Sequence, residues 1–224
     1  MFLKVGHRGA RAYETENTIE SFRKAIELGA NAIELDVRLS LDGHPVISHD
    51  ANLKKVFGKD AEVSGASLAE LRKLTENRVV TLREALKFIG KDVEKILVEL
   101  KEAGYEEKVL DVIRELGLVG RIIVVSFHEE VLARVRSLDS EIETGFVYTK
   151  FSKPIETALK LKVQYLVPLY RFVHRRDIAK AHKSGLKVIV WTVNSKMEAD
   201  LLIAKDVDGI ATDRPDILAG VRAK

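Results

Sequence analysis

The chain has 224 residues, contains no cysteine and carries a formal net charge of +3. The absence of cysteine excludes disulfides, thiolate zinc sites, iron–sulfur clusters and cysteine nucleophiles. The 37 basic and 34 acidic side chains nearly balance, which argues against a nucleic-acid-binding stripe or a polybasic membrane anchor. No apolar run approaches the roughly 20 residues of a membrane span, and the N-terminus lacks the apolar core of a signal peptide. We therefore expect a cytoplasmic protein with a single domain over residues 1–224.

Short apolar segments alternate with amphipathic helical patterns along the chain. Strands are predicted at 2–5, 32–37, 96–100, 121–125, 143–147, 164–167, 187–191 and 208–211. Helical spacing occurs at 18–28, 106–116, 129–138, 175–184 and 196–205. A Ser or Thr followed three residues later by Glu marks helix starts at Ser67, Thr81, Ser126 and Ser195.

Strict alternation of strand and helix predicts a parallel sheet with right-handed crossovers. Eight such units indicate a lean (β/α)₈ TIM barrel, a fold that takes about 250 residues on average. The alternative is a doubly wound open sheet, which usually carries a G-x-G-x-x-G turn after its first strand. The turn here reads Gly6-His7-Arg8-Gly9-Ala10 and lacks that spacing, so the α/β barrel is favoured.

One connection is longer than the others, between the second predicted strand and the helix expected after Thr81. Asp42-Gly43 between two extended runs predicts a hairpin with a two-residue loop. That register would place His49 opposite Asp36 on the same face of the hairpin. We expect residues 51–78 to form a short excursion over one end of the barrel, and such long connections are often functional.

Acidic side chains gather where a barrel places its active site, at the C-terminal ends of the strands. Glu34 and Asp36 are two residues apart and share a strand face, as do Glu99 and Lys101 on the next strand. Three converging carboxylates repel one another unless they are paired or bind a metal, and oxygen ligands suit Mg²⁺ or Ca²⁺. Pairing of Glu34 with a lysine such as Lys101, with no metal, explains the spacing equally well.

Two histidines are expected at the same end of the barrel. His7 ends the first strand, and the predicted hairpin brings His49 to the carboxylates. Imidazoles titrate near neutral pH and are suited to general acid and general base roles. The other histidines are expected on turns and helix surfaces, with the role of His128 left open.

An ordered set of motifs runs from Gly6 to Pro215. The motifs are Gly6-His7-Arg8-Gly9-Ala10, Glu16-Asn17-Thr18, Ser21-Phe22, Glu34-Leu35-Asp36-Val37, Asp42-Gly43, His49-Asp50, Glu99-Leu100-Lys101, Ser126-Phe127, Trp191-Thr192-Val193-Asn194, Asp208-Gly209 and Thr212-Asp213-Arg214-Pro215. Together they resemble the glycerophosphodiester phosphodiesterase family. The resemblance implies a (β/α)₈ barrel that cleaves glycerophosphodiesters to glycerol 3-phosphate and an alcohol with a divalent cation.

The resemblance also implies a role for each matching residue. The metal, Mg²⁺ or Ca²⁺ with Mn²⁺ as a further option, would be held by Glu34, Asp36 and Glu99. His7 and His49 would be the acid–base pair. The residues expected to bind or support the substrate are Arg8, Lys101, Glu16, Asn17, Phe127 and Trp191, with Asn17 near His7 or the phosphate. The expected partner is a small-molecule glycerophosphodiester rather than nucleic acid.

Residues 51–60 depart from the family, because many members have a Thr- and Gly-rich segment there. How the leaving alcohol is held therefore stays open. Three other functions are considered: a lysophospholipase D, a non-catalytic barrel that binds sugar phosphates, and an unrelated barrel enzyme such as an isomerase. The excursion offers few apolar side chains for an acyl chain, and the acids and histidines needed for catalysis are all present.

Overall fold

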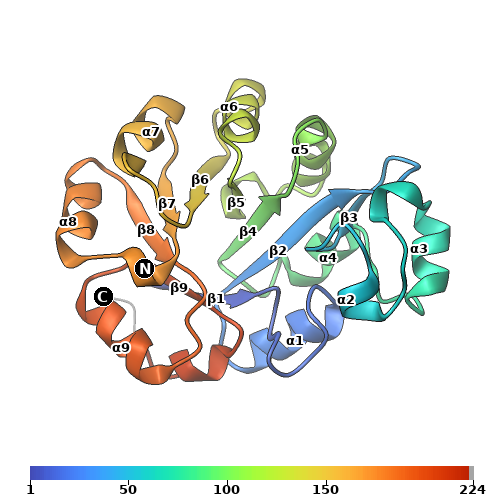
Figure 1. Cartoon of the computed structure of the whole chain (residues 1–224), viewed down its shortest axis with the longest axis horizontal. Coiled ribbons are helices and arrows are strands. Elements are labelled where there is room, and N and C mark those ends of the chain that lie inside the picture. The colour runs from blue at the N-terminus through green and yellow to red at the C-terminus, as the bar shows by residue number, and fades with distance from the viewer. Residues whose placement is uncertain (222–224) are drawn as a thin grey trace.

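Parallel strands close into a barrel in the computed structural model, which describes residues 1–221 (Figure 1). The barrel strands are β1 (Leu3–His7), β2 (Ala32–Leu39), β4 (Lys95–Leu100), β5 (Ile122–Ser126), β6 (Glu143–Tyr148), β7 (Tyr165–Pro168), β8 (Lys187–Val190) and β9 (Gly209–Thr212). They pair in the order β1-β9-β8-β7-β6-β5-β4-β2, and a β1–β2 pairing closes the ring. The eight predicted strands and the barrel are confirmed, with each strand boundary within two residues.

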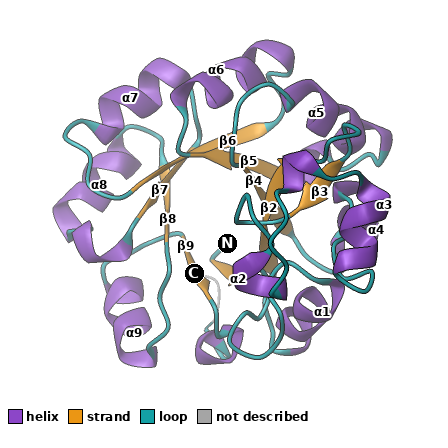
Figure 2. Cartoon of the chain, turned by 45° about the vertical axis from the view of Figure 1, so that its right-hand side comes forward, coloured by secondary structure: helices purple, strands orange, loops and turns teal. Residues whose placement is uncertain are grey.

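Helices surround the strands on the outside (Figure 2). They are α1 (Ile19–Glu27), α2 (Lys54–Phe57), α3 (Leu68–Leu74), α4 (Leu82–Ile89), α5 (Glu106–Glu115), α6 (Glu129–Leu138), α7 (Pro154–Leu161), α8 (Arg175–Lys183) and α9 (Lys196–Ala204). Across residues 1–221, none of these helices is long and apolar enough to cross a bilayer.

The period of two along each strand separates two apolar layers. On β2, Ile33, Leu35 and Val37 point outward and pack against the helices. Residues of the opposite parity face the barrel interior, where Ala32 of β2 meets Leu97 of β4. Glu34 and Asp36 share the parity of Ala32, so their side chains point into the mouth of the barrel.

The first βα loop is held close to α1 by a glycine. Gly9 has a φ of 84°, in the left-handed region, and a Cβ there would lie 2.3 Å from the Ser21 hydroxyl. Ser21 donates that hydroxyl to the Arg8 carbonyl at 2.9 Å. A side chain at Gly9 would therefore displace the loop that follows His7.

Two of the four predicted capping pairs are confirmed. Ser67 and Thr81 each form a capping box with the Glu three residues later. Ser126 is the buried last residue of β5 and donates its hydroxyl to the Leu100 carbonyl, so α6 begins without a side-chain cap. Ser195 precedes α9 but makes no capping hydrogen bond.

The hairpin that β2 forms with β3 (Pro45–Ile47) differs by one residue from the predicted register. The loop has three residues, 41–43, and Gly43 adopts the left-handed conformation that ends such loops, with a φ of 81°. The prediction that His49 lies opposite Asp36 is therefore wrong, and the Ser48 amide bonds to the Asp36 carbonyl instead. The excursion after the hairpin has a small apolar core of its own, formed by Val46, Leu53, Val63, Ala66, Leu71 and Val79.

Candidate active site

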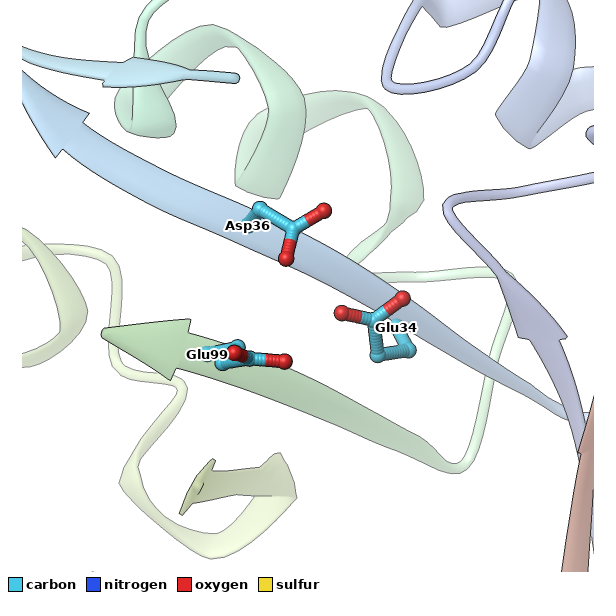
Figure 3. Close-up of side chains that lie close together, drawn as sticks. All are labelled: Glu34, Asp36 and Glu99. Atoms are coloured by element: carbon cyan, nitrogen blue, oxygen red, sulfur yellow. The ribbon is translucent and has the colours of Figure 1, made fainter. Parts of the chain in front are cut away.

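Three carboxylates meet at the C-terminal ends of β2 and β4. Asp36 lies directly opposite Glu99 in the parallel ladder, and Glu34 lies one pleat earlier on β2. One oxygen of each carboxylate lies within 4.8 Å of one oxygen of each of the others. Figure 3 shows the side chains projecting from the two strands into a common space. The sequence prediction that these acids converge is confirmed.

Two cations balance part of this negative charge. The Lys101 ammonium lies 2.5 Å from Glu99 Oε1 and 3.2 Å from Asp36 Oδ1. The Arg8 guanidinium lies 3.3 Å from Asp36 Oδ2 through its Nε. Burial opposes ionisation of Asp36, but Lys101 and Arg8 outweigh it and lower the pKa of that carboxyl. The lysine thus pairs with Asp36 and Glu99, and the suggested pairing with Glu34 is absent from residues 1–221.

Glu34 keeps one oxygen without a partner. Its Oε2 accepts a hydrogen bond from the Arg8 backbone amide at 2.8 Å. Its Oε1 is buried and has no hydrogen-bond partner among residues 1–221. Burial, together with the charges of Asp36 and Glu99, raises the pKa of Glu34 well above its ordinary value. The pKa of Glu99 rises to about 7, first from burial and then from Asp36. An unpaired buried oxygen beside two further carboxylates fits a divalent cation, so this group could hold a metal ion.

The β1–α1 loop supports the acids with side chains of its own. Arg8 donates from Nη1 to Glu16 at 2.8 Å, and Glu16 also pairs with Arg11 at 2.5 Å. The Asn17 side chain donates to Asp36 Oδ2 at 2.8 Å and accepts from the Asp36 amide at 3.3 Å. Asn17 thus orients a carboxylate, and its position near His7 or the phosphate stays a prediction.

His7 is held by the other end of the chain. Its Nδ1 lies 2.7 Å from Asp213 Oδ1, at a sequence separation of 206 residues. Asn194 donates to Asp213 Oδ2 at 2.7 Å, and its own carbonyl oxygen accepts from the Asp213 amide at 2.9 Å. Burial acts to raise the pKa of Asp213, but the bonds with His7 and Asn194 outweigh it and lower the pKa. The carboxylate is therefore ionised and accepts the Nδ1 proton, which leaves Nε2 of His7 for a substrate.

His49 has an acidic partner too. Its Nδ1 lies 2.7 Å from Asp50 Oδ1, and Arg38 donates from Nε to the His49 carbonyl at 2.9 Å. Burial lowers the pKa of His49, while the Asp36 charge opposes that shift. The Asp36 charge thus acts on this ring even though the hairpin does not place His49 directly opposite Asp36.

The sequence patterns predict no role for Asp213, Asn194, Asp50 or Arg38. Two of them carry a signal in the sequence, because Asp50 directly follows His49 and Asp213 directly follows the last strand. The contact between His7 and Asp213 joins the first and last strands, which are neighbours only once the barrel closes. Local spacing does not reveal that contact.

An aromatic pair lies on a different part of the barrel mouth. Phe127 follows β5, Trp191 follows β8, and their rings meet edge to face at 5.6 Å between centroids. The Trp191 indole donates to the Val167 carbonyl at 2.8 Å, while Phe127 is 41% exposed. The structure therefore brings the two predicted aromatic residues together as one wall.

Known proteins share this sequence and fold. The model of the glycerophosphoryl diester phosphodiesterase family matches residues 7–217. A glycerophosphodiester phosphodiesterase of Caldanaerobacter subterraneus is 32% identical over 99% of this chain and 98% of its own length. The crystal structure of a glycerophosphodiester phosphodiesterase from Agrobacterium tumefaciens superimposes with a TM-score of 0.88 at 27% identity, covering 99% and 100% of the two chains. An Oleispira antarctica phosphodiesterase, solved with the product sn-glycerol-3-phosphate, gives 0.86 at 26% identity and covers 95% and 93%. From its motifs, its fold and these matches together, the chain belongs to the glycerophosphoryl diester phosphodiesterase family.

Proposed function

We propose that this protein hydrolyses glycerophosphodiesters to glycerol 3-phosphate and an alcohol with the help of one divalent cation. The main support for this proposal is the carboxylate group of Glu34, Asp36 and Glu99. Within residues 1–221, Glu34 Oε1 has no hydrogen-bond partner. The Oleispira antarctica relative that holds sn-glycerol-3-phosphate supports the same product. We also propose a cytoplasmic location and a single domain for residues 1–224, of which 222–224 lie outside the described part.

Glu34, Asp36 and Glu99 would hold the cation. An all-oxygen donor set favours Mg²⁺ or Ca²⁺, with Mn²⁺ as a further option. When bound, such an ion neutralises the phosphodiester and stabilises the charge that develops on its oxygens. Arg8 and Lys101 lie beside the carboxylates and would contact phosphate oxygens, adding to that stabilisation.

His7 and His49 would carry the proton transfers. Each ring is held at Nδ1 by a carboxylate, Asp213 or Asp50, at 2.7 Å. The remaining nitrogen, Nε2, is then free to act on the substrate. One histidine would take the proton of the attacking hydroxyl, and the other would protonate the departing alkoxide. The attacking hydroxyl could belong to the glycerol or to water, and the two routes differ by a cyclic phosphate intermediate.

Four further residues would shape the substrate site. Glu16 and Asn17 would support it by fixing Arg8 and Asp36, respectively. Phe127 and Trp191 would form the wall beside the glycerol or the alcohol. The aromatic wall provides apolar contact without a charge, which suits the carbon skeleton of either group.

A product assay tests this function. Purified protein is incubated with glycerophosphocholine, glycerophosphoethanolamine or lysophosphatidylcholine, each with and without EDTA, and glycerol 3-phosphate and lysophosphatidate are measured. We expect glycerol 3-phosphate from the first two substrates and loss of its release in EDTA. Release of lysophosphatidate alone would establish a lysophospholipase D instead. Absence of any product with added Mg²⁺, Ca²⁺ or Mn²⁺ would contradict the proposal.

A further inference from the structure

A cavity of about 630 Å³ lies between α7 and α8, away from the three carboxylates. Figure 2 shows these two helices following one another around the barrel. Leu166 of β7 and Val188 of β8 form the floor, with Ile155 of α7 and Ile178 of α8 on the sides. Its size lies within the roughly 300–1,000 Å³ of small-molecule sites, and its floor is the outer face of the barrel.

The two helices bury few and mostly small residues against the barrel. Ala158 is the one fully buried residue of α7, and α8 buries only Ile178 and Ala181. In contrast, α4 buries Leu82, Leu86 and Ile89 as well as an alanine. Ala158 and Ala181 are buried in one cluster with Leu166 and Val188, so the base of the cleft is packed and the open space lies toward its mouth.

Aromatic side chains surround the mouth of the cleft. Tyr148, at the end of β6, stacks on Phe146, and Phe151 packs against both. Phe151 and Phe172 line the cleft while 41% and 50% exposed. Burial raises the pKa of Tyr148, so its hydroxyl stays protonated, and within residues 1–221 it makes no hydrogen bond. The mouth thus offers apolar surface together with an unused hydrogen-bond donor.

The charge at the mouth is positive. Its two acidic side chains are each paired with a neighbouring cation, Glu156 with Lys153 at 2.9 Å and Asp177 with Arg176 at 3.6 Å. Lys150 and Lys180 also line the cleft, and neither has an ion-pair partner in the described part of the chain. The two lysines therefore leave uncompensated positive charge beside an apolar floor.

We propose that the α7–α8 cleft binds a single-chain anionic amphiphile. The hydrocarbon chain would lie against the exposed rings of Phe151 and Phe172, and a carboxylate or phosphate head would meet Lys150 and Lys180. The exposed aromatic rings and the unpaired lysines match the two ends of such a molecule, whereas a purely polar ligand would leave the rings in contact with water. This site is separate from the catalytic carboxylates, so it does not depend on the proposed function.

Calorimetric titration with defined probes tests the site. The anionic probes are octanoate, decanoate and dodecanoate below their micelle concentrations, with lauroyl lysophosphatidate as the phosphate-headed counterpart. Affinity should rise by about fourfold for each buried methylene, and the tighter of dodecanoate and lauroyl lysophosphatidate identifies the head group. Neutral monolauroylglycerol should bind at least tenfold more weakly than dodecanoate. Equal binding of the neutral probe, or no binding of any anionic probe, would overturn the proposal.

Substitutions then locate the binding. The double variant Lys150→Glu/Lys180→Glu should weaken dodecanoate binding by about tenfold, and Ile155→Trp should block it by filling the cleft. The matched control is Lys160→Glu, an exposed lysine of α7 that does not line the cleft. All three should retain the helical circular dichroism and the phosphodiesterase rate of the parent. Dodecanoate binding that survives the cleft variants, or is abolished by Phe127→Ala in the catalytic mouth, would refute the assignment.

Discussion

Replacing Asp213 with Asn should disable His7 by changing which ring nitrogen carries the proton. Asn194 fixes the outcome, because its carbonyl oxygen accepts from the Asp213 amide and from Thr212, so its side-chain NH₂ must face position 213. The new amide oxygen would turn toward Asn194, and the new NH₂ would turn toward His7. Nδ1 of His7 would then accept a hydrogen bond instead of donating one, and the proton would move to Nε2.

The size of the effect follows from the bond that is lost. The two side chains are 11% and 14% exposed and 2.7 Å apart, so solvent screens the interaction little. A hydrogen bond to a charged group contributes about 1.5–3 kcal/mol, which corresponds to a fall in kcat of roughly 10- to 150-fold. KM for glycerophosphocholine should change little, because Asp213 reaches the substrate only through His7. Steady-state release of glycerol 3-phosphate measures both constants.

The control is a second histidine–aspartate pair outside the site. His182 Nε2 lies 2.8 Å from Asp208 Oδ2 between α8 and the start of β9. Asp208→Asn removes a similar bond and should reduce stability without changing kcat. A folded Asp213→Asn protein with kcat within twofold of the parent would refute the positioning of His7 by Asp213. An equal loss of kcat in Asp208→Asn would show that the effect is general destabilisation.

Three more results are expected. Glu34→Gln and Asp36→Asn should each abolish metal-dependent activity. In the metal-free protein Glu34→Gln should leave the thermal transition unchanged or higher, because burial and the neighbouring acids disfavour the Glu34 charge, whereas Asp36→Asn should lower it, because Lys101 and Arg8 lose an ionic partner; the opposite order of transition temperatures would contradict this. The pKa of Glu99 is raised from 4.5 to about 7, so the metal-free fold should lose stability as pH rises through that interval, and metal affinity should increase with pH up to about 7. Denaturant titrations and calorimetry across this range measure both, and a flat profile would oppose the assignment. His7→Ala and His49→Ala should each lower kcat by roughly 10²–10⁴-fold, and a nitrophenyl ester should rescue only the variant that lacks the acid; near-parental rates in both would exclude the acid–base pair.

Residue spacing in the sequence predicts both the barrel and the convergence of the three carboxylates, because both follow from the local periodicity of the strands. Glu34 and Asp36 share a face by the period of two, and parallel pairing then aligns Asp36 with Glu99. The register of the hairpin does not follow from periodicity, because Asp42-Gly43 is compatible with a loop of two residues and with a loop of three. Gly43 ends a three-residue loop and shifts every cross-strand pair by one.

The side-chain networks were harder to predict than the strands. Ser126 fits a capping pattern, yet its hydroxyl bonds to the Leu100 carbonyl of the neighbouring strand. The partner of Asn17 is Asp36 on β2, and that of His7 is Asp213, which directly follows β9. Such choices depend on which elements become neighbours in the closed barrel, which the local pattern of one element does not specify.

The pairing of His7 with Asp213 also bears on how the protein acquires its activity during folding. The two residues are 206 positions apart: His7 is the last residue of β1, and Asp213 directly follows β9, the strand paired with β1 along one seam of the barrel. Contacts at such long separation form late, because the intervening chain must first lose its conformational freedom. Recovery of phosphodiesterase turnover after dilution from denaturant therefore reports the closing of the seam. Helical circular dichroism, which depends on local contacts, should return earlier than turnover.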